Sequence, residues 1–242
     1  MVASAPEVSS GAGSIVPARP HVSRLSGDQL CLGVLTAILA LTCWRLLEGG
    51  VTAGQDAITQ FYPWYSYLGE RLREFGIPSW NPSQFSGAPF ASDPQSGWSY
   101  FPVMGLFTAF PLGVAVPLYI AVHLALAGYG TYWLARTLRI APLGALTAGV
   151  AYMLSGPIFS RSVCCPAQVQ VGAWVPLLLV GAELALQQPI LRRRVPWIVL
   201  SALAMSQILA SWLGQGSYYA LMLMGAFLGW RALVQPARGN VP

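Results

Sequence analysis

The stretch from Val195 to Trp230 contains no charged residue, and this feature restricts the fold more than any other. A helix needs about 20 mainly apolar residues to cross a bilayer, so the stretch is too long for one crossing. A polar, glycine-containing segment at 211–217 divides it into two predicted spans. Charged residues make up 9% of the chain, against about 25% in an ordinary soluble domain. The sequence therefore predicts a membrane protein and excludes a disordered chain, a soluble nucleic-acid-binding protein and a disulfide-rich secreted module.

Four more apolar segments precede this stretch. Each has the length and hydrophobicity of a membrane span, and they cover about 28–47, 114–134, 143–159 and 168–186. Together the segments predict an all-α, polytopic membrane bundle of about six transmembrane helices. We divide the chain into a flexible tail at 1–28 and a transmembrane module at 29–242.

The tail at 1–28 is rich in Ala, Ser, Gly and Pro and has no helical periodicity. A cleaved signal peptide is the alternative, because the small residues at 51–53 resemble a cleavage site. We favour a retained first span. The tail is long for the basic region of a signal peptide, and Arg45 and Glu48 stand between the apolar run and that site.

The arginines predict the orientation of the bundle. All 13 basic residues are arginine. With six spans and a cytoplasmic N-terminus, nine arginines lie inside and four outside, which follows the positive-inside rule. The inside set is Arg19, Arg24, Arg136, Arg139, Arg192, Arg193, Arg194, Arg231 and Arg238, and the outside set is Arg45, Arg71, Arg73 and Arg161.

The first loop, at 49–112, is extracytoplasmic in this topology and far longer than most connections. Its part at 58–75 begins with aromatic residues and ends with charged ones, which is typical of an interfacial helix in the headgroup layer. Its part at 76–102 contains five prolines and predicts a fixed irregular surface. Four of the eight acidic residues lie in this loop, namely Asp56, Glu70, Glu74 and Asp93.

Asp56 is the main candidate for chemistry, because it lies just beyond the first span and ahead of the aromatic segment. A carboxylate there is well placed to act as a general base on the hydroxyl group of a sugar acceptor. The alternative, which the local pattern favours, is an exposed residue that caps the helix beginning near Ile58.

Other side chains of the outer loop suit the binding of a sugar. A long loop that is rich in Trp, Asn, Gln and Asp can form a sugar-binding wall, and the candidates are Trp80, Asn81, Asp93 and Gln95. The alternative for Asp93 is a turn, because it precedes Pro94 and an Asp–Pro pair commonly begins a turn.

Three outer arginines are candidates for binding the phosphate of a donor. Arg161 follows the third span, and its guanidinium suits a phosphate as well as it suits an interfacial anchor. Arg71 and Arg73 have the same two possibilities, but Glu70 and Glu74 beside them favour local pairing.

The remaining polar features of the spans have simpler explanations. His123 lies near the centre of the second span, and we favour a neutral histidine bonded to a neighbouring helix over a functional group. The triplet at 192–194 is predicted to set the topology and to touch anionic lipid.

We expect neither a metal nor a cofactor. The two histidines are far apart, and the chain has no CxxC, HExxH, GxGxxG or GxxxxGK[ST] pattern. Its four cysteines are too few for a disulfide framework. Cys31 and Cys43 lie in an apolar run and are predicted to be packing residues that face lipid or another helix, and a bond between the adjacent Cys164 and Cys165 would be strained.

Several motifs of the outer loop occur together in a particular order. They are Asp56 followed by Gln60-Phe61-Tyr62-Pro63-Trp64, then Ile77-Pro78-Ser79-Trp80-Asn81-Pro82, Phe85-Ser86-Gly87-Ala88-Pro89, Asp93-Pro94-Gln95-Ser96-Gly97 and Tyr100-Phe101-Pro102. This series resembles the YfhO-like family of bacterial membrane proteins, which belongs with the GT-C-type glycosyltransferases. Weaker matches within the spans extend the resemblance over about 29–232.

The resemblance implies an α-helical, multi-pass protein of the bacterial plasma membrane. Such a protein transfers a sugar from a polyprenyl-phosphate donor to a cell-envelope glycan or polymer. The resemblance also implies that Asp56 is the catalytic base and that Asp93 is a second acidic position of the loop. Members of the family usually have many more spans, so we expect this chain to be an N-terminal portion.

Two alternatives to a transferase remain. The first is a non-enzymatic component for transport or assembly that binds envelope lipids or glycans. Transporters usually show charged or broken helices at the midplane and repeated halves, and the uncharged third, fifth and sixth spans disfavour transport. The second is an inactive truncated fragment.

Overall fold

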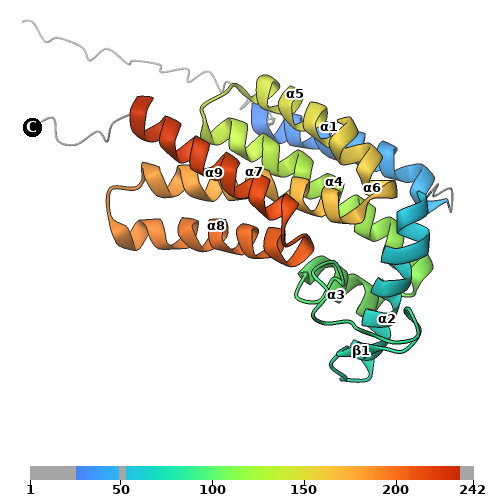
Figure 1. Cartoon of the computed structure of the whole chain (residues 1–242). Coiled ribbons are helices and arrows are strands. Elements are labelled where there is room, and N and C mark those ends of the chain that lie inside the picture. The colour runs from blue at the N-terminus through green and yellow to red at the C-terminus, as the bar shows by residue number, and fades with distance from the viewer. Residues whose placement is uncertain (1–25, 49–52, 235–242) are drawn as a thin grey trace, which may run out of the picture.

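The computed structural model describes residues 26–48 and 53–234, and at 45–47 it describes the backbone alone. Nearly all of its regular structure is helical (Figure 1). The elements are α1 (Gly27–Leu47), η1 (Ala57–Phe61), α2 (Tyr62–Arg73), β1 (Trp80–Asn81), β2 (Ala88–Pro89), α3 (Phe101–Ala109), α4 (Leu112–Thr137), α5 (Pro142–Met153), η2 (Gly156–Ser160), α6 (Arg161–Cys164), α7 (Pro166–Gln187), α8 (Leu191–Ser211) and α9 (Gln215–Val234). Most of the predicted tail and of the cleavage-like segment lies outside the described residues.

The predicted spans correspond to helices of the structure. Five helices are long and apolar enough to cross a membrane, namely α1, α4, α7, α8 and α9. A sixth candidate is α5 with the segment Gly156–Cys164, which bends away from it by 42°. We predicted one continuous span at 143–159. Pro157 explains the break, because its ring lacks an N–H donor and restricts the residue before it.

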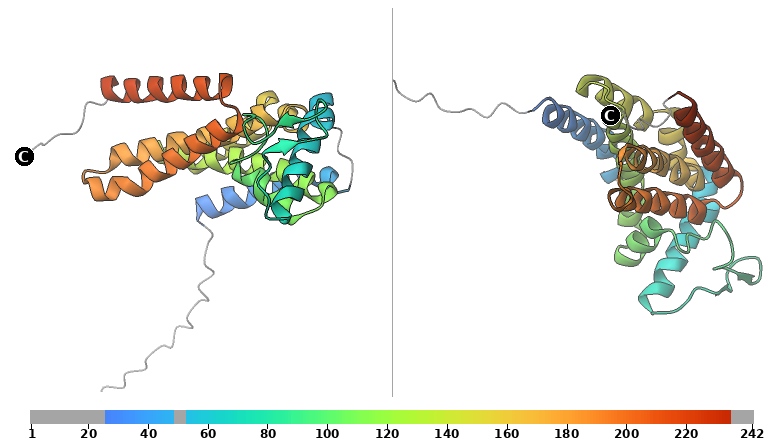
Figure 2. Two further views of the ribbon diagram at one scale, coloured as in Figure 1. Left: turned by 60° about the horizontal axis from the view of Figure 1, so that its bottom comes forward. Right: turned by 90° about the vertical axis from the view of Figure 1, so that its left-hand side faces the viewer.

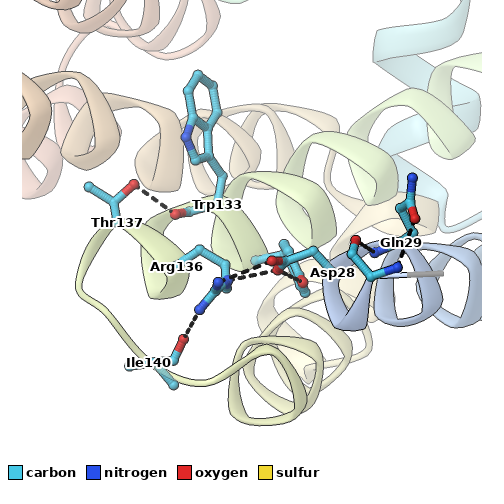
Figure 3. A network of polar contacts seen from close by, with 8 residues as sticks. Asp28, Gln29, Trp133, Arg136, Thr137 and Ile140 are labelled. Carbon is cyan, nitrogen blue, oxygen red and sulfur yellow. Dashed lines mark hydrogen bonds and ion pairs between the residues drawn. The ribbon is translucent and has the colours of Figure 1, made fainter. Parts of the chain in front are cut away.

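The spans alternate in direction. We call the arginine end the end of the bundle where α4 and α7 finish and α1, α5 and α8 begin. Here the Arg136 guanidinium donates two hydrogen bonds to the Asp28 carboxylate, at 2.7 and 3.0 Å, and ties α4 to α1 (Figure 3). The Gln187 side chain at the end of α7 donates to the carbonyl of Thr137. The predicted inside arginines of the spans therefore gather at one end, and its cytoplasmic location stays a prediction.

The last helix, α9, is the least buried of the spans, and it stands away from the α7–α8 pair in the left view of Figure 2. Its buried residues, Gly216, Ser217 and Ala220, all lie near its start. Towards its other end, Arg231 forms a 2.6 Å ion pair with Glu183 of α7. This ion pair therefore anchors the second half of α9.

The outer loop folds into a small module at the opposite end of the bundle, around α2, α3 and the β1–β2 hairpin (Figure 1). We expected its aromatic rings to face the headgroup layer. Instead Phe61, Tyr62, Trp64 and Tyr65 are buried within the protein. One reason is α3, an apolar helix that the sequence analysis did not predict, which packs with the start of α4 against the ring of Tyr65. A second is the loop after the hairpin, whose Phe90 packs against the ring of Trp64.

Gly69 allows this packing. A Cβ atom built at this position of α2 would lie 2.0 Å from the carbonyl oxygen of Phe107 in α3. The Arg73 guanidinium donates to the same carbonyl at 2.9 Å and to that of Thr108 at 3.1 Å. It thus satisfies carbonyls at the C-terminal end of α3, where a cation also complements the helix dipole.

Candidate functional site

A groove of about 910 Å³ lies between the η1–α2 segment and the loop that follows it. The helical wall presents Gln60, Tyr62, Trp64, Tyr67 and Glu70, and the loop wall presents Asn81, Gln84 and Asp93. Carboxylates and amides thus face one another across a space that aromatic rings also line. Such a mixed lining suits a polar ligand that also has apolar faces.

The helical wall follows from the spacing of its residues. Gln60, Trp64, Tyr67 and Glu70 are three or four residues apart, which places them on one side of a helix. The first turn of this wall is π-helical, at Ala57–Phe61. π-Turns are rare and occur often at functional sites.

The loop wall is built from turns that side chains hold in place. The Asn81 Oδ1 atom accepts a bond from the Ser83 backbone N–H at 3.0 Å, and Asp93 Oδ1 accepts one from Gln95 N–H at 2.8 Å. Asp93 therefore has the predicted turn role while it also lines the groove. Its second carboxylate oxygen makes no hydrogen bond with the described residues.

The two walls are fixed to each other. The Tyr67 hydroxyl donates to the Trp80 carbonyl at 2.6 Å, where β1 pairs with β2. Phe90 follows the hairpin, is fully buried and packs edge-on against the rings of Trp64 and Tyr67. Gly87 has φ +110° and makes room for the Trp80 ring in the hairpin turn. The groove is therefore a preformed feature of the outer module.

One polar atom of the groove lacks a partner. The Tyr62 hydroxyl is buried and makes no hydrogen bond with the described residues. Burial raises the pKa of Tyr62 to about 12, so the phenol stays protonated and remains a donor. A buried hydroxyl without a partner costs about 1–3 kcal/mol. A ligand in the groove can remove this cost only if the Tyr62 side chain turns to expose its hydroxyl, which has almost no accessible surface in the structure.

Asp56 and Arg161 lie on adjacent segments at the edge of the module. The Gly54 backbone N–H donates to the Val163 carbonyl at 2.8 Å, which joins the two segments. Both side chains are exposed, and they form no ion pair in the described part of the chain. Asp56 makes no side-chain capping bond to the helix that follows it, and the groove lining begins two residues later at Ile58.

Two of the four cysteines are bonded to each other. Cys164 and Cys165 form a disulfide despite their adjacency, and the Arg161 Nη1 atom lies 3.4 Å from the Cys165 sulfur. Cys31 and Cys43 are both buried in the core, which agrees with the predicted packing against other helices and not with the lipid-facing alternative.

The other predicted site residues lie outside the groove lining. Arg71 pairs locally with Glu74 at 2.6 Å, in agreement with the local alternative. Trp80 is 54% exposed, with its ring against the hairpin turn, and Gln95 lies in the turn after Asp93. A role for these side chains in substrate binding stays a prediction.

His123 has a structural environment. Its Nδ1 atom lies 2.6 Å from the Tyr119 carbonyl, and its Nε2 atom lies 2.6 Å from the Tyr100 hydroxyl. A carbonyl only accepts, so the proton sits on Nδ1, and Nε2 accepts from Tyr100. The Trp174 indole donates to the Tyr100 oxygen at 3.0 Å. This chain of bonds ties the end of the outer loop to α4 and α7.

The sequence analysis missed several lining residues, above all Tyr62, Tyr67 and Glu70. Their helical spacing was a usable signal, but only the folding of the hairpin over α2 shows which side of the helix the loop covers. No group of three metal-binding side chains occurs among the residues that the structure describes.

Comparisons with protein-family models, curated proteins and solved structures found no match to this chain. The resemblance to the YfhO-like family therefore stays a prediction, and function must be argued from the site.

Proposed function

We propose that this chain is the N-terminal part of a membrane glycosyltransferase-like protein that acts on a cell-envelope glycan. The observation that carries the proposal is the outer groove, in which the carboxylates of Glu70 and Asp93 lie among aromatic rings. A glycan has many hydroxyl groups that can bond these carboxylates. It also has apolar faces that suit the rings of the groove.

In this proposal the acceptor glycan lies in the groove with one hydroxyl group directed towards Asp56. The Asp56 carboxylate takes the proton of that hydroxyl as its oxygen attacks the anomeric carbon of the donor. The bond between the anomeric carbon and the donor phosphate breaks, and the polyprenyl phosphate leaves with the electron pair. Arg161 balances the negative charge of the phosphate. The adjacency of the two segments supports this division of roles.

The test is the Asp56→Asn substitution in the full-length protein, assayed for glycan transfer in membranes. General base catalysis contributes about 10²–10⁴-fold, so we expect a loss of at least 100-fold with normal membrane insertion. Glu74→Gln is the matched control, because Glu74 is exposed and pairs with Arg71 outside the groove lining. Unchanged glycan transfer by the Asp56→Asn variant would show that Asp56 is not the catalytic base.

A second candidate is a protein that binds envelope glycans without transferring a sugar. The observation in its favour is that Asp56 makes no side-chain hydrogen bond to a described residue that would orient it. Glycan binding measured by calorimetry separates the two candidates. A Glu70→Gln variant should weaken binding in both, whereas Asp56→Asn should matter only for transfer.

A further inference from the structure

An apolar groove of about 260 Å³ runs along the membrane-embedded face of α4. Its α4 lining includes Val122, Leu126, Tyr129 and Trp133, and α7 contributes Leu177. These α4 positions recur every three or four residues, so they form one continuous stripe. With a rise of about 1.5 Å per residue, the stripe is about 16 Å long, roughly half of a hydrocarbon core. The groove therefore has the length of one lipid leaflet.

The walls of this groove offer one free polar group, the Trp133 indole N–H, which makes no hydrogen bond with the described residues. The other polar side chain of the lining is Tyr129. Its hydroxyl forms a 2.7 Å hydrogen bond with Thr36 of α1. The other lining side chains are apolar. A saturated or isoprenoid hydrocarbon chain fits such apolar walls. A sugar or a peptide backbone would bury its own polar groups there without hydrogen-bond partners.

The groove leads towards the arginine end. Trp133 forms its last turn, and the indole points away from the Arg136–Asp28 pair (Figure 3). The ring of Trp133 meets the ring of Trp197 in α8 edge-on, with centroids 6.2 Å apart. Arg193 lies one helical turn before Trp197, on the same side of α8. The apolar groove, the tryptophan pair and the Arg193 guanidinium thus follow one another along the bundle. The acyl tail, the interfacial region and the headgroup of a lipid have the same order.

Arg193 is available for a headgroup. It is exposed, and within the described residues it has no carboxylate partner. Two neighbouring arginines are occupied, since Arg136 pairs with Asp28 and Arg194 donates to the Gln188 carbonyl. Arg192 is also exposed, but it lies about 100° around the helix from the side that carries Trp197.

We propose that this face binds one anionic phospholipid, with an acyl chain along α4 and the phosphate at Arg193. The site lies at the opposite end of the bundle from Asp56, so it is separate from the proposed transfer site and does not depend on it. The charge of the headgroup is what distinguishes this occupant from a neutral lipid, because guanidinium groups near the membrane surface attract anionic headgroups.

The experiment is native mass spectrometry of the full chain in detergent, titrated with phosphatidylglycerol and with phosphatidylcholine of identical acyl chains. We expect tighter binding of phosphatidylglycerol to the wild-type protein. Arg193→Gln should reduce this preference about fivefold, the factor that corresponds to about 1 kcal/mol for one arginine at a membrane surface. Ala125→Trp should block the groove and reduce binding of both lipids, because Ala125 also lines it.

Two matched controls make the result decisive. Arg192→Gln removes the same charge one position earlier, about 100° around the helix, and should change the preference much less. Ala226→Trp adds the same ring to an exposed position of α9, away from the groove, and should leave binding unchanged. Equal losses for Arg192→Gln and Arg193→Gln would show diffuse attraction and would overturn the site. Equal binding of the two lipids by the wild-type protein would also overturn it.

Discussion

Substituting Gly69 by alanine tests the packing that shapes the outer groove. Helix propensity alone predicts that this change in the middle of α2 stabilises the protein by about 1 kcal/mol. The structure predicts the opposite sign. The new Cβ atom would lie 2.0 Å from the Phe107 carbonyl oxygen, whereas ordinary contacts begin at 3.4 Å. The two helices must therefore separate by about 1.4 Å, the difference between these distances.

The magnitude follows from three contributions. Overpacking of this kind costs about 1–3 kcal/mol. The separation also weakens the bond from Arg73 to the same carbonyl, and a hydrogen bond to a charged group is worth about 1.5–3 kcal/mol. Subtracting the propensity gain leaves a net destabilisation of about 2 kcal/mol. In a chain of this size, that corresponds to a fall of about 4–8 °C in Tm.

The assay is thermal unfolding of the full chain in detergent, with Gly105→Ala as the matched control. Gly105 lies in α3 of the same module, and a Cβ atom there would meet no other atom within 4 Å. We expect Gly105→Ala to raise Tm slightly and Gly69→Ala to lower it. Glycan binding should weaken only in the Gly69 variant, because α2 forms one wall of the groove. A rise in Tm for both variants would refute the reasoning.

Three further predictions concern buried polar groups. Tyr100→Phe leaves the His123 Nε2 atom and the Trp174 indole N–H without partners, and it should lower the unfolding free energy by about 2–4 kcal/mol in denaturant titrations. Tyr62→Phe removes a buried, unpartnered hydroxyl, so Tm should stay the same or rise; a fall in Tm would show that the hydroxyl is bonded. Glu183→Gln leaves Arg231 as an unpaired cation and should cost about 3 kcal/mol, and replacing both residues by leucine should restore much of the loss.

The sequence was a reliable guide to the spans because the requirement of a bilayer is local. Each crossing must satisfy its backbone hydrogen bonds within one helix and must be apolar over about 20 residues. Both conditions can be evaluated along a one-dimensional chain. The predicted break at 211–217 corresponds to the gap between α8 and α9, and the predicted span at 28–47 corresponds to α1.

The bend in the third span was also encoded locally, in Pro157, although hydrophobicity alone predicted a continuous span. The aromatic segment at 58–75 shows a different limit of sequence analysis. Aromatic residues suit a headgroup layer and a protein core equally well, and their composition cannot distinguish the two. In the structure α3 packs against this segment, through Phe107 on Tyr65, and places its aromatic rings in the protein core.

The candidate site required the tertiary structure. The sequence singled out Asp56, Asp93 and Asn81 as individual residues, and the fold placed Asp93 and Asn81 in a groove with Glu70 while it left Asp56 at the edge. These relations depend on contacts between residues that are distant in the chain, such as Gly54 with Val163. A span is determined by its own residues, whereas a groove is determined by which surfaces meet, and the folding of the outer loop decides that.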